Sequence, residues 1–175
     1  MFLSTERLVV RRFRVGDAEA FSGYRSVPEV AQWQSWEAPY SMEEAVKAVE
    51  AFAAGDPLVP GWFQYAVDRD GVLIGDIGVN LHENLMQAEI GYTFAPEYQG
   101  QGYATEAVRG LLGLLFVERK LHRVSAECDA RNVSSARLLE RLGFRLEGLR
   151  LSNTWFKGEW TDDQLFGLLA SDWPT

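Results

Sequence analysis

Cysteine, basic residues and long apolar runs are scarce in this chain, and each shortage excludes a class of protein. Cys128 is the only cysteine among 175 residues, so no internal disulfide can form and the sequence suits a reducing compartment. No run reaches the roughly 20 apolar residues of a membrane span, and the first residues lack the basic and apolar regions of a signal peptide. Lys and Arg number 17 against 25 Asp and Glu, a net charge of −8 that argues against non-specific nucleic-acid binding. We expect a cytoplasmic protein that binds neither nucleic acid nor membrane.

The residues that are abundant indicate one well-packed domain. The chain is 47% hydrophobic, with six Trp and ten Phe, which excludes a disordered protein and leaves aromatic rings to line a pocket. A domain of this length buries roughly 70% of the surface that its unfolded chain exposes. No repeat, low-complexity segment or linker divides the sequence. Residues 1–175 are therefore expected to form a single α/β domain, whose negative charge slightly favours cationic substrates such as amines.

Hydrophobic periodicity predicts strands alternating with helices. Strands are expected at 8–13, 62–68, 72–81, 87–94, 123–129, 145–153 and 161–169. Helices are expected at 18–25 behind an Asp17 cap, from the Ser41 capping box to 54, at 104–120 and at 134–142. The pairs Asp70-Gly71 and Lys157-Gly158 are typical of hairpin turns. The Trp-bearing stretch 28–39 allows no prediction.

A glycine loop at 98–105, Tyr-Gln-Gly-Gln-Gly-Tyr-Ala-Thr, lies between a predicted strand and a predicted helix. Glycine permits tight turns and close approach of a ligand, and the first N–H groups of a helix have no partner inside it. Because the helix dipole also favours negative charge there, the loop is a candidate phosphate site. It fits neither the dinucleotide fingerprint nor the P-loop, since Thr105 replaces the required Gly or Ala and a Gly-Lys pair is missing. A turn without any ligand is the alternative.

The run from Ala88 to Ala107 resembles the acetyl-CoA-binding motif of the GCN5-related N-acetyltransferases (GNAT). In the family pattern Gln/Arg-x-x-Gly-x-Gly/Ala, the matching residues are Gln99, Gly102 and Ala104. Further segments resemble the RimJ/RimL-like branch, which modifies ribosomal-protein N-termini. These are Thr5-Glu6-Arg7-Leu8, Asn132-Val133-Ser134-Ser135, Leu142-Gly143-Phe144, and Glu147-Gly148 with Asp163. The resemblance extends over essentially the whole chain.

That resemblance implies an α/β (α+β) fold and a place for the coenzyme. The sheet is expected to be mixed, mostly antiparallel and of about seven strands, flanked by helices and splayed between its fourth and fifth strands, Glu89–Phe94 and Arg123–Asp129. Acetyl-CoA is the implied acyl donor, with no metal, since His82 and His122 lie far apart. Its pantetheine arm would meet the main chain of Phe94 and Ala95, as an added strand does. The residues implied to hold the rest of the coenzyme are Gln99, Gly100, Gln101, Gly102, Tyr103, Ala104, Thr105, Asn132, Ser135 and Arg137.

Catalysis requires a base for the attacking amine and an acid for the leaving thiolate. Glu89 is the candidate base, with an ordinary surface carboxylate as the alternative. Many relatives have a tyrosine seven residues after the asparagine, where this chain has Leu139, and the resemblance makes Ser135 the candidate catalytic group beside the coenzyme sulfur. Trp33, Trp36 and Tyr40 are candidate acceptor-binding residues, and core packing is their alternative.

The expected function is acetyl-CoA-dependent N-acetylation of a primary amine, on a protein N-terminus or a small molecule. Two alternatives stay open: a non-catalytic acyl-CoA sensor or interaction protein on the same fold, and a transferase that uses a longer acyl-CoA such as succinyl-CoA. Homodimers are common among relatives, but no feature of the sequence establishes one.

Overall fold

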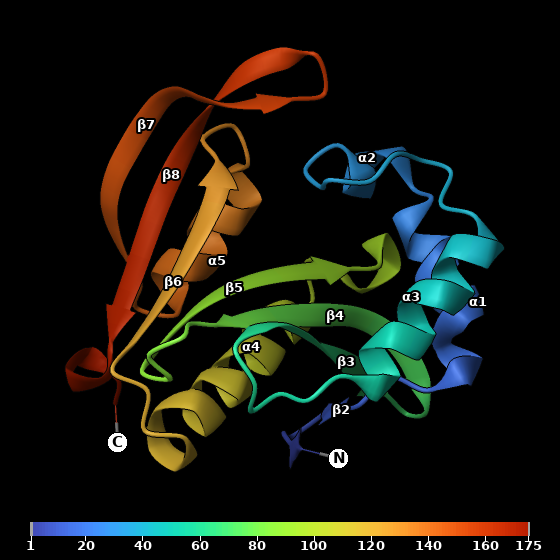
Figure 1. Ribbon diagram of the computed structural model, residues 1–175, viewed down its shortest axis with the longest axis horizontal. Helices are drawn as coiled ribbons and strands as arrows, with labels where there is room; N and C mark the ends of the chain where they lie inside the picture. The colour runs from blue at the N-terminus through green and yellow to red at the C-terminus, as the bar shows by residue number, and fades with distance from the viewer. Residues whose placement is uncertain (1, 175) are drawn as a thin grey trace.

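An eight-stranded mixed sheet in the order β1-β2-β3-β4-β5-β6-β8-β7 forms the centre of the computed structural model, which describes residues 2–174 (Figure 1). The strands are β1 (Leu3–Ser4), β2 (Val9–Arg11), β3 (Gly61–Arg69), β4 (Val72–Leu81), β5 (Gln87–Phe94), β6 (Arg123–Asp129), β7 (Arg145–Phe156) and β8 (Glu159–Leu169). The helices are α1 (Ala18–Arg25), α2 (Pro28–Ala31), α3 (Met42–Ala54), α4 (Tyr103–Gly113) and α5 (Val133–Arg141). The α/β class and the mixed sheet are confirmed. The additional strand is β1, whose two residues are too few to produce a pattern.

The sheet divides between β5 and β6, the only parallel neighbours among the strands of residues 2–174. They pair over three positions, Gln87 with Arg123, Ala88 with Val124 and Glu89 with Ser125. Beyond Glu89 the strands separate, although β5 continues to Phe94 and β6 to Asp129. The splay is therefore confirmed at the two strands expected, which are fifth and sixth once β1 is counted.

Local sequence signals place most element ends. Ser41 Oγ accepts from Glu44 N at 3.2 Å and Glu44 Oε2 accepts from Ser41 N at 3.0 Å, so the capping box forms and α3 begins there. Both predicted hairpin turns have two consecutive residues of positive φ, as type I′ turns require; at Lys157-Gly158 the values are 47° and 87°. The predicted helix at 104–120 ends sooner as α-helix, because α4 passes into a π-helical turn at Leu114–Glu118.

The expectation that the Asp17 side chain caps α1 is wrong. Helix α1 does follow Asp17, but its carboxylate makes no capping bond. It binds the buried Arg11 guanidinium instead, with two N–O distances of 2.8 Å, and accepts from Arg14 N. Arg11 Nε also donates to Asp68 at 2.8 Å. A buried cation recruits both carboxylates because leaving its charge unpaired would cost several kcal/mol.

Helices cover both faces of the sheet. Tyr65 packs in a large core with α4 and α5, whereas the next residue, Ala66, packs in a second core with α1 and α3. Successive side chains of a strand point to opposite faces, so the two helix pairs lie on opposite sides. No helix among residues 2–174 is long and apolar enough to cross a membrane.

Candidate functional site

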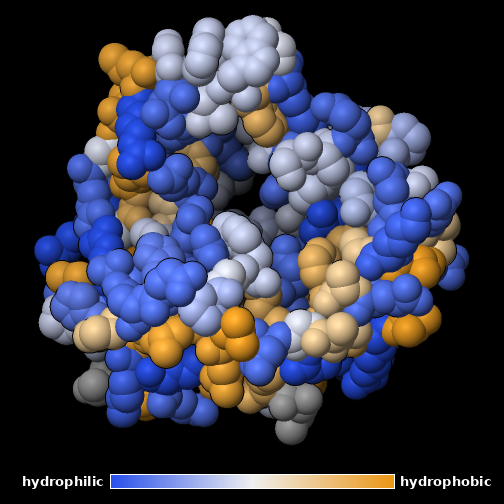
Figure 2. All heavy atoms as spheres, in the orientation of Figure 1, coloured by the Kyte–Doolittle hydropathy of each residue, from blue (hydrophilic) through white to orange (hydrophobic). Residues whose placement is uncertain are grey.

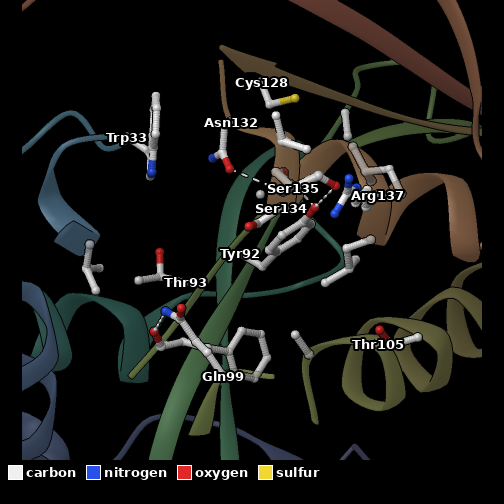
Figure 3. A pocket seen from close by; sticks show the side chains of 18 of the residues that line it. Trp33, Tyr92, Thr93, Gln99, Thr105, Cys128, Asn132, Ser134, Ser135 and Arg137 are labelled. Atoms are coloured by element: carbon white, nitrogen blue, oxygen red, sulfur yellow. Dashed lines mark hydrogen bonds between the residues drawn. The ribbon is translucent and has the colours of Figure 1, made fainter. Parts of the chain in front are cut away.

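A cavity of about 980 Å³ lies where β5 and β6 separate. Segments distant in sequence form its walls: 29–34 around α2, 90–94 of β5, 98–105 with the start of α4, 126–129 of β6, and 131–141 with α5. Figure 2 shows this face of the molecule hollowed near its centre, and Figure 3 shows the side chains inside. The split in the sheet therefore creates the space that an extended ligand needs.

The glycine loop presents free donors to this cavity. Gly100 and Gly102 have φ of 71° and 83°, in the left-handed region that glycine adopts without strain. The first helical bond is donated by Glu106 N to Gly102 O at 3.0 Å, and within residues 2–174 no protein acceptor takes the N–H groups of 100–105. Six N–H groups at a helix start form a concentrated anion site. Of the predicted loop residues, Gln99, Gly100, Gly102, Tyr103, Ala104 and Thr105 line the cavity.

The N-terminal segment holds this loop in place. Glu106 accepts from Arg7 Nε at 2.6 Å and from Thr5 Oγ1 at 2.6 Å. Burial opposes its ionisation, but the hydrogen bonds from Thr5 and Arg7 outweigh that cost and lower the pKa of Glu106. The Arg7 guanidinium also lies 4.4 Å from the centre of the Tyr103 ring and donates to Gln101 O. Gln101 itself faces away from the cavity and donates to Glu97 O at 2.7 Å.

The end of β5 offers fewer free main-chain groups than expected. Ala95 N donates to Ile74 O at 3.0 Å, so this N–H belongs to β4, and Ala95 does not line the cavity. Alternate residues turn their main-chain groups the other way, so Tyr92 and Phe94 face the split. The Gln99 side chain already donates to Phe94 O at 2.9 Å.

A hydroxyl pair lies opposite, where α5 begins. Tyr92 Oη and Ser135 Oγ are 2.8 Å apart, and Asn132 Oδ1 caps the helix by accepting from Ser135 N at 3.1 Å (Figure 3). Burial raises the pKa of Tyr92 well above its usual range, although the bond to Ser135 opposes the shift. Leu139, where many relatives have the tyrosine, is fully buried core.

Tyr92 was not singled out from the sequence. Strand alternation could have pointed to it, since it lies on the same face of β5 as the core residues Ala88 and Ile90. Cys128 lines the same part of the cavity as a half-buried thiol. Burial raises the pKa of Cys128 to about 11, with Ser135 opposing the shift.

Two glutamates flank the point where the strands part. Glu89 forms the last pair of the β5–β6 ladder and is half-buried. Its pKa is raised, first by burial and then by repulsion from Glu127, while His82 and a hydrogen bond from Asn80 oppose the rise. Glu89 is not in the cavity wall, whereas Glu127, which sequence reasoning missed, is. Its position two residues beyond Ser125 on β6 places it on the same face as Glu89.

The three aromatic candidates occupy different places. Trp33 lines the cavity, and Figure 3 shows it across from Asn132. The Arg25 guanidinium stacks on Trp36, 3.7 Å from the centre of the tryptophan ring, and Trp36 Nε1 donates to Arg25 O at 3.0 Å. Tyr40 packs edge-to-face on Phe21, and neither Trp36 nor Tyr40 lines the cavity.

The β7–β8 hairpin reaches across to the α2 segment. Lys157 Nζ donates to Ala31 O and to Trp36 O, both at 2.7 Å, and lies 3.6 Å from Glu37 Oε2. We call these contacts the Lys157 clasp. Figure 1 shows the tip of the hairpin leaning from β7 and β8 toward α2. The clasp thereby joins the β7–β8 hairpin to the α2 segment, whose residues Trp33 and Gln34 line the cavity.

Residues 7–145 match the acetyltransferase (GNAT) domain, and the chain belongs to this family. The chain is an N-acetyltransferase of the GNAT fold. It is 32% identical to the uncharacterized N-acetyltransferase YnaD of Bacillus subtilis (strain 168), with 99% of each chain covered. It is 28% identical to the [ribosomal protein uS5]-alanine N-acetyltransferase of Escherichia coli (strain K12), covering 98% of this chain and 92% of the relative.

Solved acetyltransferase structures superpose on this chain over nearly its whole length. A GNAT-family acetyltransferase from Bacillus anthracis superposes with a TM-score of 0.89 at 30% identity, covering 98% of this chain and 99% of the other. Mycobacterium smegmatis RimJ, solved in complex with CoA-disulfide, superposes with a TM-score of 0.85 at 25% identity, covering 96% of this chain and 84% of the other. The RimJ/RimL-like resemblance is thus confirmed, and enzymes of this family use acyl-CoA.

Proposed function

We propose that this N-acetyltransferase moves the acetyl group of acetyl-CoA to a primary amine, on a protein N-terminus or a small molecule. One observation carries the proposal: a single cavity is lined by five loop residues with free N–H groups, by the Tyr92–Ser135 hydroxyl pair, and by Trp33 and Glu127. Donor and acceptor can therefore meet at the split of the sheet.

The coenzyme fits this cavity by chemistry. The loop N–H groups suit a pyrophosphate, and Arg137 at the exposed rim adds positive charge. The strand edge at Tyr92 and Phe94 suits the pantetheine amides. That path leads the thioester toward Ser135, near Tyr92. Asn132 acts here through its cap, which fixes the first turn of α5.

The acceptor amine would bind beside Trp33 and Glu127, which both line the cavity. An ammonium ion is attracted by Glu127 and by the ring of Trp33. It must lose a proton to attack the thioester carbon, and Glu89 is the carboxylate whose pKa is raised toward that task, acting through an intervening water. The tetrahedral intermediate then expels the thiolate.

A panel of amines tests the acceptor. The purified protein is mixed with acetyl-CoA and peptides with free N-termini, a polyamine, an aminoglycoside or free amino acids, and release of the free thiol is followed. We expect turnover with at least one amine. CoA binding without turnover on any of them would favour the sensor alternative, and faster turnover with succinyl-CoA in competition would reassign the donor.

Glu89→Gln tests the base. The amide is isosteric but cannot accept the proton, so kcat should fall by about a hundredfold or more while the Kd for CoA is unchanged. Glu43→Gln, an exposed glutamate on α3, is the matched control. Unchanged turnover in Glu89→Gln would remove Glu89 from the mechanism.

A further inference from the structure

The enzyme lacks a tyrosine on α5, yet a tyrosine hydroxyl reaches the same helix from the opposite wall. The Tyr92 side chain leaves β5 and crosses the cavity to the first turn of α5, where Oη lies 2.8 Å from Ser135 Oγ and 3.2 Å from Ser135 O (Figure 3). Two elements on either side of the split are thus joined through one pair of hydroxyls.

Each hydroxyl has one proton, and this limits which of the two can donate the hydrogen bond between Tyr92 and Ser135. Tyr92 has one O–H and two acceptors in reach, the carbonyl and the hydroxyl of Ser135. If Tyr92 donates to the carbonyl, Ser135 must donate to Tyr92, and its proton points away from the cavity. If Tyr92 donates to Ser135 Oγ, the serine proton is free to point at a group in the cavity. Only the second arrangement makes Ser135 an acid.

We infer that Tyr92 is the positioning residue that makes Ser135 the acid for the leaving thiolate. As the carbon–sulfur bond breaks, its electron pair stays on sulfur, which takes the Ser135 proton. Tyr92 keeps its proton and its hydrogen bond to Ser135 Oγ throughout, and Ser135 regains a proton from solvent when CoA leaves. Tyr92 thereby supplies from β5 the tyrosine hydroxyl that is missing at Leu139 on α5.

The surroundings favour this role over simple packing. Asn132 fixes the Ser135 backbone by accepting its N–H, so the serine hydroxyl has little freedom except to rotate. Cys128, which also interacts with Ser135, is a thiol whose S–H is only a weak donor. Of these two side chains, Tyr92 is therefore the stronger donor, and its Oη is the one placed 2.8 Å from Ser135 Oγ.

The inference rests on the coenzyme site proposed above, so the experiment separates the two. CoA affinity and amine turnover of the wild-type enzyme are measured first. A wild type that binds no CoA contradicts the coenzyme site. With a working wild type, the variants Tyr92→Phe, Ser135→Ala and the double variant are compared, with Tyr65→Phe as a matched control because Tyr65 lies in the core and does not line the cavity.

We expect Tyr92→Phe to lower kcat by about tenfold to a hundredfold with no change in the Kd for CoA. Because Tyr92 acts through Ser135, the double variant should be no slower than Ser135→Ala alone. Tyr65→Phe should keep wild-type kcat. The inference is overturned if Tyr92→Phe keeps full kcat, if the losses multiply in the double variant, or if CoA affinity falls in step with kcat, which would show a packing role. A thermal melt of each variant identifies any that fails to fold, and in that case Tyr92→Leu replaces Tyr92→Phe in the same comparison.

Discussion

Glu89 and Glu127 illustrate how single residues tune the cavity. The two carboxylates lie on one face of neighbouring strands, and the charge of Glu127 disfavours ionisation of Glu89. Burial disfavours the charged form of Glu89 even more, and the two effects together raise its pKa. A base with a raised pKa holds a proton more strongly once it has accepted it from the amine.

This coupling predicts a pH effect. Since Glu89 must be ionised to act as a base, kcat/KM should rise with pH through its raised pKa and fall below it. Glu127→Gln removes the repulsion, so this acid limb should move to lower pH by up to about one unit. The measurement is kcat/KM against pH for the wild type, Glu127→Gln and Glu43→Gln. An acid limb that stays at the same pH in Glu127→Gln would show that Glu127 does not affect the ionisation of Glu89.

Cys128 allows a second residue-scale prediction. Only the thiolate reacts with alkylating agents, and burial raises the pKa of Cys128 to about 11. Iodoacetamide should therefore label the folded enzyme slowly at pH 7 to 8 and progressively faster as the pH approaches 11. Because Cys128 is the only cysteine, mass spectrometry reads the result directly.

The unfolded protein in urea is the control, since an exposed thiol has a pKa of about 8.5 and reacts quickly. Saturating CoA should slow labelling of the folded enzyme further, because Cys128 lines the cavity. Equal labelling rates for folded and unfolded enzyme at pH 8 would contradict the buried thiol.

At the scale of elements, the glycine loop depends on the left-handed backbone of Gly100, and Gly158 in the β7–β8 turn is a matched comparison. Gly100 has a φ of 71° and Gly158 a φ of 87°, and no atom lies within 4 Å of a Cβ placed on either. Alanine at either site should cost about 1 kcal/mol of unfolding free energy through left-handed strain. Only Gly100 borders the cavity, so Gly100→Ala alone should weaken CoA binding, by about tenfold.

Calorimetric titration of CoA and thermal melts check this pair of variants. If Gly158→Ala weakens CoA to the same extent, the effect is global destabilisation. If Gly100→Ala binds CoA as the wild type does, the loop does not hold the pyrophosphate.

Elements with local signals were predictable, and elements held by distant partners were not. Strands β5 and β6 have the predicted bounds, because the alternation of inward-facing and outward-facing residues can be recognised within each strand. Strand β7 was expected to stop at 153 but runs to Phe156 past an irregular stretch in which Ser152 has a φ of 44°. The α2 segment gave no prediction because Lys157, more than 120 residues away, helps to hold it.

The same distinction applies to the candidate site. Free N–H groups follow from glycine and a helix start, so the loop could be recognised from sequence. Tyr92 and Glu127 could not, because their importance depends on which strands face each other across the split. The roles of Trp36 and Tyr40 likewise depend on Arg25 and Phe21, around which they pack.

For the whole molecule, the Lys157 clasp predicts a coupling between distant segments. Lys157→Met removes two charge-assisted hydrogen bonds while keeping an unbranched side chain, which should lower the local opening free energy by about 1–3 kcal/mol. Amide exchange at 31–37 and 153–160 should then rise together, about fivefold to a hundredfold. KM for the amine should rise, while the Kd for CoA should not change.

Hydrogen-exchange mass spectrometry and steady-state kinetics measure these effects. Lys47→Met is the control, because Lys47 forms an exposed ion pair within α3 that contributes little. Exchange that rises at one segment without the other would show that the clasp does not join them.

The Lys157 clasp lies outside the part of the chain that matches the family model. The region matching the acetyltransferase domain ends at residue 145, whereas the clasp lies at Lys157, on a hairpin beyond it. The matched region contains the glycine loop and the split strands, and the hairpin beyond it holds the α2 segment that carries Trp33. Exchanging this hairpin between relatives should therefore change how firmly the α2 segment is held beside the cavity, while the glycine loop keeps its own contacts to Thr5 and Arg7.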